Sequence, residues 1–371
     1  MSSQKENLGH RLFFKIKWTK QKQPNYQINY YTVSLAGGYS EIQPKKNQDS
    51  YFNVKCENFD QNCYFLSVLD GHGIDGHKVS SYISKNLPKN YQLELQNTSS
   101  KVLQQSSIKM ENQIKNQIKI QKQNTSIFQK LRSAFLQTNQ ELKEILKFDT
   151  HTSGSTCIAV HIYDNKIYCA NTGDSRAILC SIDQFSDNKD KLIINQQSII
   201  QDQEQISQQK ITINEKQWTI TQLSTDQTPN NQNEKQRIIE AGGQILQQRS
   251  KLGFLTGPER VWVKYKDYPG LAMTRSFADF QGEQAGIICD PVINCFKLSQ
   301  NDKILVLASD GIWDVLSNKD VLQILIPYYQ NNDPKNGASH LSKIANKKWI
   351  QSDSNHTDDI TCTVCFLDNF V

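Results

Sequence analysis

Three acidic residues in this chain stand next to apolar runs that are typical of buried strands. Asp70 ends one such run and is followed directly by Gly71 and His72. Asp310 ends a second apolar run, and Asp358 comes just before an alternating segment near the end of the chain. An apolar run that stops abruptly at Asp-Gly predicts a strand whose end presents the acid. Three aspartate-tipped strands so far apart in sequence predict that the fold gathers them into one metal site.

Three further acids, Asp49, Asp174 and Asp314, also lie at predicted strand ends or in the adjoining loops. No soft ligands are arrayed with them, so an oxygen-rich site for Mg²⁺ or Mn²⁺ fits better than a zinc site. Converging carboxylates repel one another unless bound cations remove that cost. Two such cations about 3.5–4 Å apart would lower the pKa of a bridging water and make hydroxide available near neutral pH.

The residues that follow Asp70 could serve the same chemistry. Gly71 has no side chain, so its carbonyl can come close to a cation. His72 could donate a proton to a leaving oxygen. A basic residue would also be needed to hold an anionic phosphate. On their own, however, Asp-Gly pairs are most often simple turns, and it is their recurrence that favours a site.

The elements that would position these residues are strands with helices inserted between hairpins. Asp164 and Asn165 mark one hairpin turn, and Pro88 is expected to stop the helix that begins near Gly76. Other predicted strands lie at residues 28–35, 51–55, 63–69, 217–223, 304–309 and 361–367, and other helices at 128–148, 233–241, 319–326 and 338–349. A helical or turn element is expected at residues 271–277. This order predicts an α+β fold of antiparallel sheets with helices packed outside.

The chain reads as one domain, residues 28–371, preceded by a basic tail, residues 1–27. The tail fits either a poorly ordered end that packs an aromatic side chain onto the domain or a docking segment for an acidic partner or a membrane surface. Segments rich in Gln, Asn, Lys and Ser near residues 92–127 and 183–215 are predicted to be low-complexity surface insertions.

Composition narrows the class of protein. The net charge of +5 is too small and diffuse to indicate a nucleic-acid partner, and no apolar stretch is long enough to predict a membrane span. The N-terminus has no secretory signal pattern. Nine scattered cysteines, an odd number, favour reduced and mostly buried thiols in an intracellular protein, in the cytoplasm or nucleus. Cys362 and Cys365 are expected to point to opposite faces of one strand.

The order of the motifs resembles that of the metal-dependent protein serine/threonine phosphatases of the protein phosphatase 2C family, in the branch found in plants and protists. The resemblance runs from about residue 37 to 367. It is carried by NQDS (47–50), VLDGHGIDGH (68–77), SGST (153–156), NTGDSRA (171–177), LSTDQTP (223–229), NEKQRIIEAGG (233–243), GLAMTRSFADF (270–280), LASDGIWDVLSN (307–318) and DDIT (358–361).

The resemblance implies a layered α-β-β-α sandwich with a metal site at one end. It implies hydrolysis of phosphoserine and phosphothreonine in proteins by a water that bridges two divalent cations, Mg²⁺ or Mn²⁺. The implied metal residues are Asp70, which bridges both cations, the Gly71 carbonyl, Asp310 and Asp358, with Asp49 acting on a metal-bound water and Asp174 and Asp314 holding a weaker third cation. His72 falls at the position of the general acid.

Departures from the family pattern concern the neighbours of these residues. Gln48 stands where many members have Glu, and Ala278 replaces the usual Gly before Asp279. The phosphate-binding Arg has no clean match, although Lys45 or Lys46 could substitute for it. Two rivals of the phosphatase are a catalytically weak module that only binds phosphoproteins and a metal-dependent nuclease or cyclase. The expected partners are phosphoprotein substrates, with no nucleic acid, no membrane span and a monomeric chain.

Overall fold

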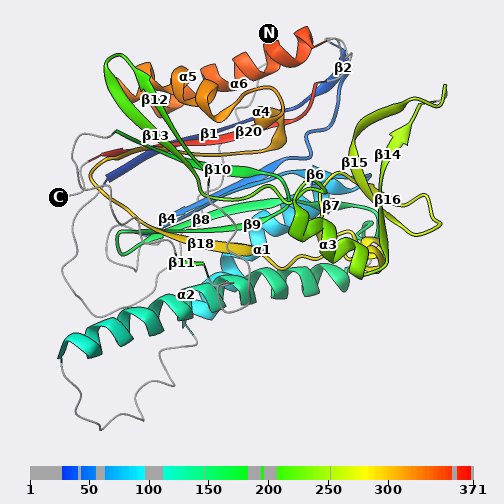
Figure 1. The fold of residues 1–371 in the computed structure, drawn as a ribbon, viewed down its shortest axis with the longest axis horizontal. Coiled ribbons are helices and arrows are strands. Elements are labelled where there is room, and N and C mark those ends of the chain that lie inside the picture. The colour runs from blue at the N-terminus through cyan, green and yellow to red at the C-terminus, as the bar shows by residue number, and fades with distance from the viewer. Residues whose placement is uncertain are drawn as a thin grey trace, which may run out of the picture.

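Two six-stranded antiparallel sheets pack face to face, and helices cover both outer faces (Figure 1). The computed structural model describes residues 27–40, 43–55, 63–96, 112–145, 147–182, 194–195, 207–250, 252–352 and 357–368. The predicted tail, apart from Gln27, lies outside the described residues, as do parts of both predicted insertions. The layered α+β architecture predicted from the sequence is confirmed.

The first sheet contains both ends of the described chain. Its order is β1 (Gln27–Leu35), β20 (Ile360–Asp368), β19 (Asp302–Ala308), β10 (Arg176–Ile182), β13 (Lys216–Gln222) and β12 (Gln208–Ile213). Its outer face is covered by α5 (Asn318–Gln330) and α6 (Pro334–Gln351) (Figure 1). The acid-bearing helix α4 (Asp310–Trp313) follows β19 directly.

The second sheet lies against the other two long helices. Its order is β11 (Ile194–Asn195), β18 (Val292–Lys297), β9 (Lys166–Thr172), β8 (Cys157–Tyr163), β5 (Tyr64–Leu69) and β4 (Ser50–Lys55). Its outer face is covered by α1 (Gly76–Gln96) and α2 (Asn112–Lys143) (Figure 1).

Smaller elements gather at one end of the sandwich. A three-stranded sheet joins β6 (Gly71–His72), β7 (Gly154–Ser155) and β17 (Phe277–Ala278), and β2 (Gly38–Ser40) pairs with β3 (Gln43–Pro44). Beside them, a second three-stranded sheet of β14 (Gly243–Arg249), β15 (Leu255–Val263) and β16 (Pro269–Leu271) projects from the body (Figure 1). It packs on α3 (Gln232–Glu240) and the 3₁₀ helix η3 (Phe280–Ala285).

The apolar run before Asp70 is buried on both faces, which explains why it lacks polar alternation. Tyr64, Leu66 and Val68 point between the two sheets, and Phe65 and Leu69 point toward α1 and α2. Successive side chains of a strand point to opposite faces, so a strand in a middle layer must be apolar throughout. Strand β5 is therefore held rigidly, and the residue that follows it has a well-defined position.

The cysteines agree with the prediction of buried thiols. All eight described cysteines are buried and none of them is in a disulfide, while Cys56 lies outside the described residues. Cys362 belongs to the core under α5 and α6, and Cys365 to the core between the sheets. The pair therefore faces opposite sides of β20, as expected. No described helix is both long and apolar enough to cross a membrane.

Several predicted elements were wrong in detail. Pro88 does not stop α1, which continues to Gln96 because Tyr91 and Leu95, which follow the proline, are buried in the core. Tertiary packing thus outweighs the missing backbone donor of proline. Of the two alternatives for residues 271–277, the helix is wrong, because the segment is a connection from β16 to β17 that bends at residues 272–274.

Other boundaries differ as well. Helix α2 begins at Asn112, inside the first predicted insertion, and ends at Lys143 instead of Phe148. Within the second predicted insertion, β12 forms an edge strand that pairs with β13.

Candidate metal centre and active site

Four predicted site aspartates meet at the end of the sandwich that carries β6 and β7. Asp70 follows β5, Asp310 begins α4, Asp358 precedes β20 and Asp49 precedes β4. Burial raises the pKa of Asp70 well above its usual range, and the charges of the other three carboxyl groups raise it further. Gly71, which follows Asp70, lies against the backbone of Gln48, and Gly311, which follows Asp310, lies against the backbone of Asp359. Each acid is thus next to a residue in contact with a neighbour of another acid, and the four carboxyl groups share one site.

The backbone around these acids is fixed by neutral hydroxyl groups. The Thr156 hydroxyl accepts a hydrogen bond from the Asp70 N–H (3.1 Å), and the Thr156 N–H donates to the Asp70 carbonyl (2.9 Å). The Ser309 hydroxyl donates to Oδ2 of Asp49 (2.9 Å) and accepts from the Thr361 N–H (3.1 Å). Thr156 of the motif SGST and Ser309 of the motif ASDG therefore support acids that come from other motifs.

The carboxylate oxygens of these acids are ligands of the kind that a hard divalent cation prefers. Oδ1 of Asp49, of Asp174 and of Asp310 is buried and has no hydrogen-bond partner. Burial and the charges of Asp359 and Asp358 raise the pKa of Asp49 to about 7, against the hydrogen bonds that it accepts. Unpaired buried carboxylate oxygens are costly, and a cation removes that cost. Within the described ranges, no three acidic, histidine or cysteine side chains are arranged closely enough to hold a metal ion as they stand.

A second acidic group adjoins the first. Burial raises the pKa of Asp174 to about 7, and the charges of Asp226 and Asp314 contribute. Asp226 was not among the predicted site residues. Its carboxylate pairs with the guanidinium of Arg176, which also lies 5.1 Å from the ring centroid of Trp313. Asp314 is exposed, so this second group is more open to solvent than the first.

The predicted general acid, His72, has a buried partner. Its Nε2 lies 2.5 Å from Oδ2 of Asp279, a residue that is only 1% exposed. Burial lowers the pKa of His72, but Asp279 outweighs it and the pKa is raised overall. Nothing in the local sequence pointed to Asp279 as a site residue, because its relation to His72 depends on the pairing of three short strands.

Gly71 occupies a place that no larger residue could fill. A Cβ at this position would lie 2.5 Å from the carbonyl oxygens of both Gln48 and Gly76. The Gln48 side-chain amide donates to the Gly73 carbonyl (2.6 Å), a bond that an ionised Glu side chain could not form. Gln48 therefore anchors the DGHG loop in this chain.

Of the two predicted phosphate-binding lysines, the structure brings Lys45 to the acids. Its Nζ lies 2.7 Å from Oδ1 of Asp358 and 3.3 Å from Oδ2 of Asp359. Burial lowers the pKa of Lys45, but the two carboxylates raise it well above its usual range. Lys46 is exposed. Asp359 itself is buried and accepts hydrogen bonds from the Gly37 N–H (2.7 Å) and the Gln48 N–H (3.0 Å), so it organises the loop.

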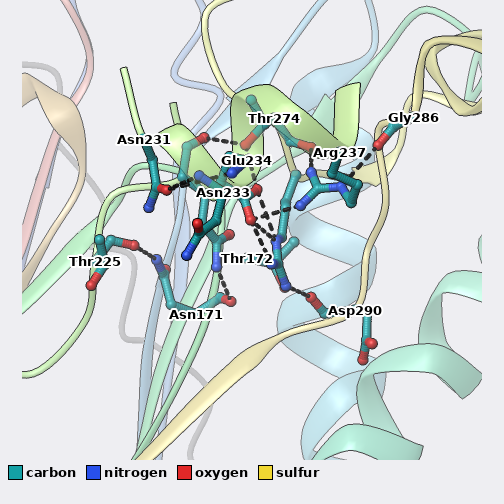
Figure 2. Close-up of polar contacts among 12 residues, drawn as sticks. Asn171, Thr172, Thr225, Asn231, Asn233, Glu234, Arg237, Thr274, Gly286 and Asp290 are labelled. Atoms are coloured by element: carbon teal, nitrogen blue, oxygen red, sulfur yellow. Dashed lines mark hydrogen bonds and ion pairs between the residues drawn. The ribbon is translucent and has the colours of Figure 1, made fainter. Parts of the chain in front are cut away.

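Arg275 is engaged with a core carboxylate. Figure 2 shows the buried carboxylate of Glu234 at the centre of a polar network that reaches Arg237 and Thr274. Arg275 donates to Glu234 through Nη2 (2.6 Å) and to the Asp290 carbonyl through Nη1 (2.7 Å). Burial raises the pKa of Glu234, but the two guanidinium groups outweigh it and hold that pKa at about 2. The network secures α3, and with it the sheet β14–β15–β16, to the body.

Comparisons with known proteins identify the family of this chain. The family model for protein phosphatase 2C matches residues 45–351. A probable protein phosphatase 2C of Arabidopsis thaliana is 29% identical over 92% of this chain and 84% of its own length. A second, from Oryza sativa, is 30% identical over 86% of this chain and 69% of its own length.

Solved structures share the fold. A serine-threonine phosphatase 2C from Toxoplasma gondii superposes with a TM-score of 0.67 at 15% identity, over 96% of this chain and 99% of that one. A sex-determining protein of C. elegans superposes with a TM-score of 0.59 at 19% identity, over 94% of this chain and 66% of that one. The family match covers most of the sequence, and the chain is a protein phosphatase that belongs to the protein phosphatase 2C family.

Proposed function

We propose that this chain hydrolyses phosphoserine and phosphothreonine in proteins with two divalent cations, Mg²⁺ or Mn²⁺, held by Asp70, Asp310 and Asp358. The observation that carries the proposal is the meeting of four carboxyl groups in which burial and neighbouring carboxylates raise the pKa values of Asp49, Asp70 and Asp310. Oδ1 of Asp49 and of Asp310 is buried and has no hydrogen-bond partner. Such an arrangement is costly unless cations bind there.

Each remaining site residue has a role in this proposal. The Gly71 carbonyl would complete the ligands, Asp49 would orient the attacking water, and Asp174 and Asp314 would hold a third, weaker cation. When bound, the cations would supply a water of lowered pKa and would offset the charge of the phosphate. The other steps fall to side chains of this chain.

Two side chains would act on the substrate. His72 would give a proton to the leaving serine or threonine oxygen, a step that commonly contributes about 10²–10⁴-fold. The Lys45 ammonium, which lies against Asp358, would contact the phosphate as a point charge. Its neighbour Lys46 is exposed and has no role in the proposal.

We infer a single catalytic domain over residues 28–371 that acts as a monomer in the cytoplasm or nucleus. The pairing of β1 with β20 supports the single domain, because the first and last described strands complete the same sheet.

The test is release of inorganic phosphate from a phosphoserine peptide at saturating Mn²⁺. We expect turnover by the unaltered protein, and loss of nearly all of it with EDTA or in Asp310→Asn. Asp320→Asn is the control, because Asp320 also lies in the first turn of a helix but is outside the site. Peptide binding without turnover by both the unaltered protein and Asp310→Asn would instead support a binding module. Cleavage of nucleic acid in place of the peptide would support a nuclease.

A further inference from the structure

We propose that Asp279 is a positioning residue that fixes the His72 imidazole so that Nδ1 is the nitrogen presented to the leaving-group oxygen. This inference rests on the proposed function, in which His72 supplies a proton. It adds to that function a residue that holds the proton donor in one orientation and one tautomer.

The pairing of three short strands brings the two side chains together. His72 in β6 and Ala278 in β17 both pair with Gly154 in β7, one from each side. Asp279 follows Ala278 directly, and its Oδ2 lies 2.5 Å from Nε2 of His72. A Cβ at Gly154 would lie only 2.0 Å from that same Oδ2. The glycine therefore leaves the room in which the carboxylate reaches the imidazole.

The hydrogen bond decides which ring nitrogen remains available. A carboxylate accepts hydrogen bonds, so Nε2 of His72 carries the proton that it shares with Asp279. Nδ1 of His72 is buried and has no hydrogen-bond partner among the described residues. Since Nε2 is occupied, Nδ1 is the nitrogen through which His72 can exchange a proton with a ligand.

The backbone holds Asp279 in an unusual conformation. Ala278 and Asp279 have φ values of 58° and 49°, in the left-handed region that residues with a side chain rarely adopt. The conformation is secured because the Ala278 N–H donates to Oδ1 of Asn139 (2.8 Å) and the Asp279 N–H donates to the Ser153 carbonyl (3.2 Å). Strain of this kind is concentrated at functional sites.

The test compares two substrates that differ in their need for a proton. The serine oxygen of a phosphopeptide leaves poorly without one, whereas p-nitrophenolate leaves readily as an anion. For Asp279→Asn at saturating Mn²⁺, we expect kcat on the peptide to fall by roughly 10- to 100-fold. On p-nitrophenyl phosphate we expect a fall of less than about threefold, and KM for both should stay within about twofold. Asparagine is suitable because it tolerates the left-handed conformation.

Two controls separate positioning from general damage. Glu283 lies in the 3₁₀ helix that follows Asp279, and it forms an exposed ion pair with Lys143 of α2. We expect Glu283→Gln to leave both activities unchanged. In the His72→Ala background, Asp279→Asn should cause little further loss on the peptide, because its effect passes through His72. An equal loss on both substrates, or full additivity with His72→Ala, would overturn the proposal.

A measurement without catalysis keeps the two proposals distinct. In ¹⁵N-histidine NMR spectra of the full chain, we expect His72 to be protonated at Nε2, and Asp279→Ala to disperse it between tautomers. Protonation at Nδ1 alone in the unaltered protein would contradict the positioning role. Failure of the unaltered protein to hydrolyse either substrate would overturn the proposed function, and the NMR result would then still decide the His72–Asp279 relation.

Discussion

The Nζ of Lys45 lies 2.7 Å from Oδ1 of Asp358, a residue 313 positions further along the chain. It also lies 3.3 Å from Oδ2 of Asp359, so one ammonium compensates two adjacent carboxylates. Both Lys45 and Asp358 are largely withdrawn from solvent, with side chains 17% and 30% exposed. Removal of one partner should therefore cost more than in an ordinary surface ion pair, because it leaves the remaining charge uncompensated away from water.

Lys45→Met is expected to lower the unfolding free energy of the metal-free protein by about 1–3 kcal/mol, because two carboxylates lose their partner. The matched variant Lys46→Met should change it by less than about 0.5 kcal/mol, since Lys46 is exposed. Urea denaturation in EDTA measures both. Equal effects of the two substitutions would show that the contact with Asp358 and Asp359 contributes no net stability.

Gln48→Glu is expected to destabilise the metal-free protein but to increase the stabilisation that Mn²⁺ provides. The substitution removes the donor to the Gly73 carbonyl and adds a carboxylate near Asp49 and Asp70. The unfolding free energy of the metal-free variant should fall by about 1–2 kcal/mol. The rise in Tm on addition of Mn²⁺ should exceed that of the unaltered protein.

Gln48→Met serves as the comparison for this prediction, because it loses the hydrogen bond without gaining charge. Thermal unfolding with and without Mn²⁺ measures all three proteins. If Gln48→Glu and Gln48→Met respond equally to Mn²⁺, the added carboxylate does not reach the metal centre.

Glu234→Gln is expected to lower the unfolding free energy by about 3–5 kcal/mol, because it leaves Arg275 and Arg237 without their buried counter-charge. The pKa of Glu234 is held at about 2, below its usual value of 4.5. A lowered pKa means that the unfolded state binds the proton more readily. The stabilisation that the ionised Glu234 contributes to the folded state is therefore complete above about pH 4.5 and is lost as the pH falls toward 2. The difference in unfolding free energy between the unaltered protein and Glu234→Gln, measured by urea denaturation, should shrink over that pH range.

His161 is expected to make stability fall on mild acidification. Its ring is fully buried among aromatic side chains, with Tyr91 and Tyr163 at centroid distances of 5.2 and 5.8 Å. Burial lowers the pKa of His161 to about 3, so below pH 6.5 the unfolded state takes up a proton that the folded state excludes. That uptake should cost about 2 kcal/mol between pH 7 and pH 5.

His161→Leu removes the titrating group and keeps an apolar side chain in the cluster. We expect its unfolding free energy to fall less between pH 7 and pH 5 than that of the unaltered protein, by about the same 2 kcal/mol. Parallel curves for the two proteins would show that His161 does not titrate on unfolding.

Ala278→Gly is expected to raise stability by up to about 1 kcal/mol, because glycine adopts the left-handed conformation without strain. Ala285→Gly offers a matched control in the adjoining 3₁₀ helix, where the alanine is fully buried and its backbone is not left-handed. The unfolding free energy of Ala285→Gly should fall by about 1 kcal/mol. The same loss in both variants, measured as Tm, would show that position 278 is not strained.

Much of the fold followed from local pattern. Strand β5 and its successor Asp70 could be predicted because an apolar run ending in Asp-Gly reports burial and a turn within a few residues. Other elements could not, because packing decided them. Pro88 stands inside α1, although its own preference is to end a helix. The core contacts of Leu87 and Tyr91 outweigh that preference.

The sequence by itself determined the set of acids and their order along the chain, because residue type and strand periodicity are local properties. Only the tertiary structure decided which acids serve which neighbour. Lys45 and Lys46 are indistinguishable as letters, yet one reaches Asp358 and the other faces solvent. His72 and Asp279 are 207 residues apart, and they meet because His72 and Ala278, the residue before Asp279, both pair with Gly154. Contacts of this kind depend on strand pairing across the whole chain, which no local pattern encodes.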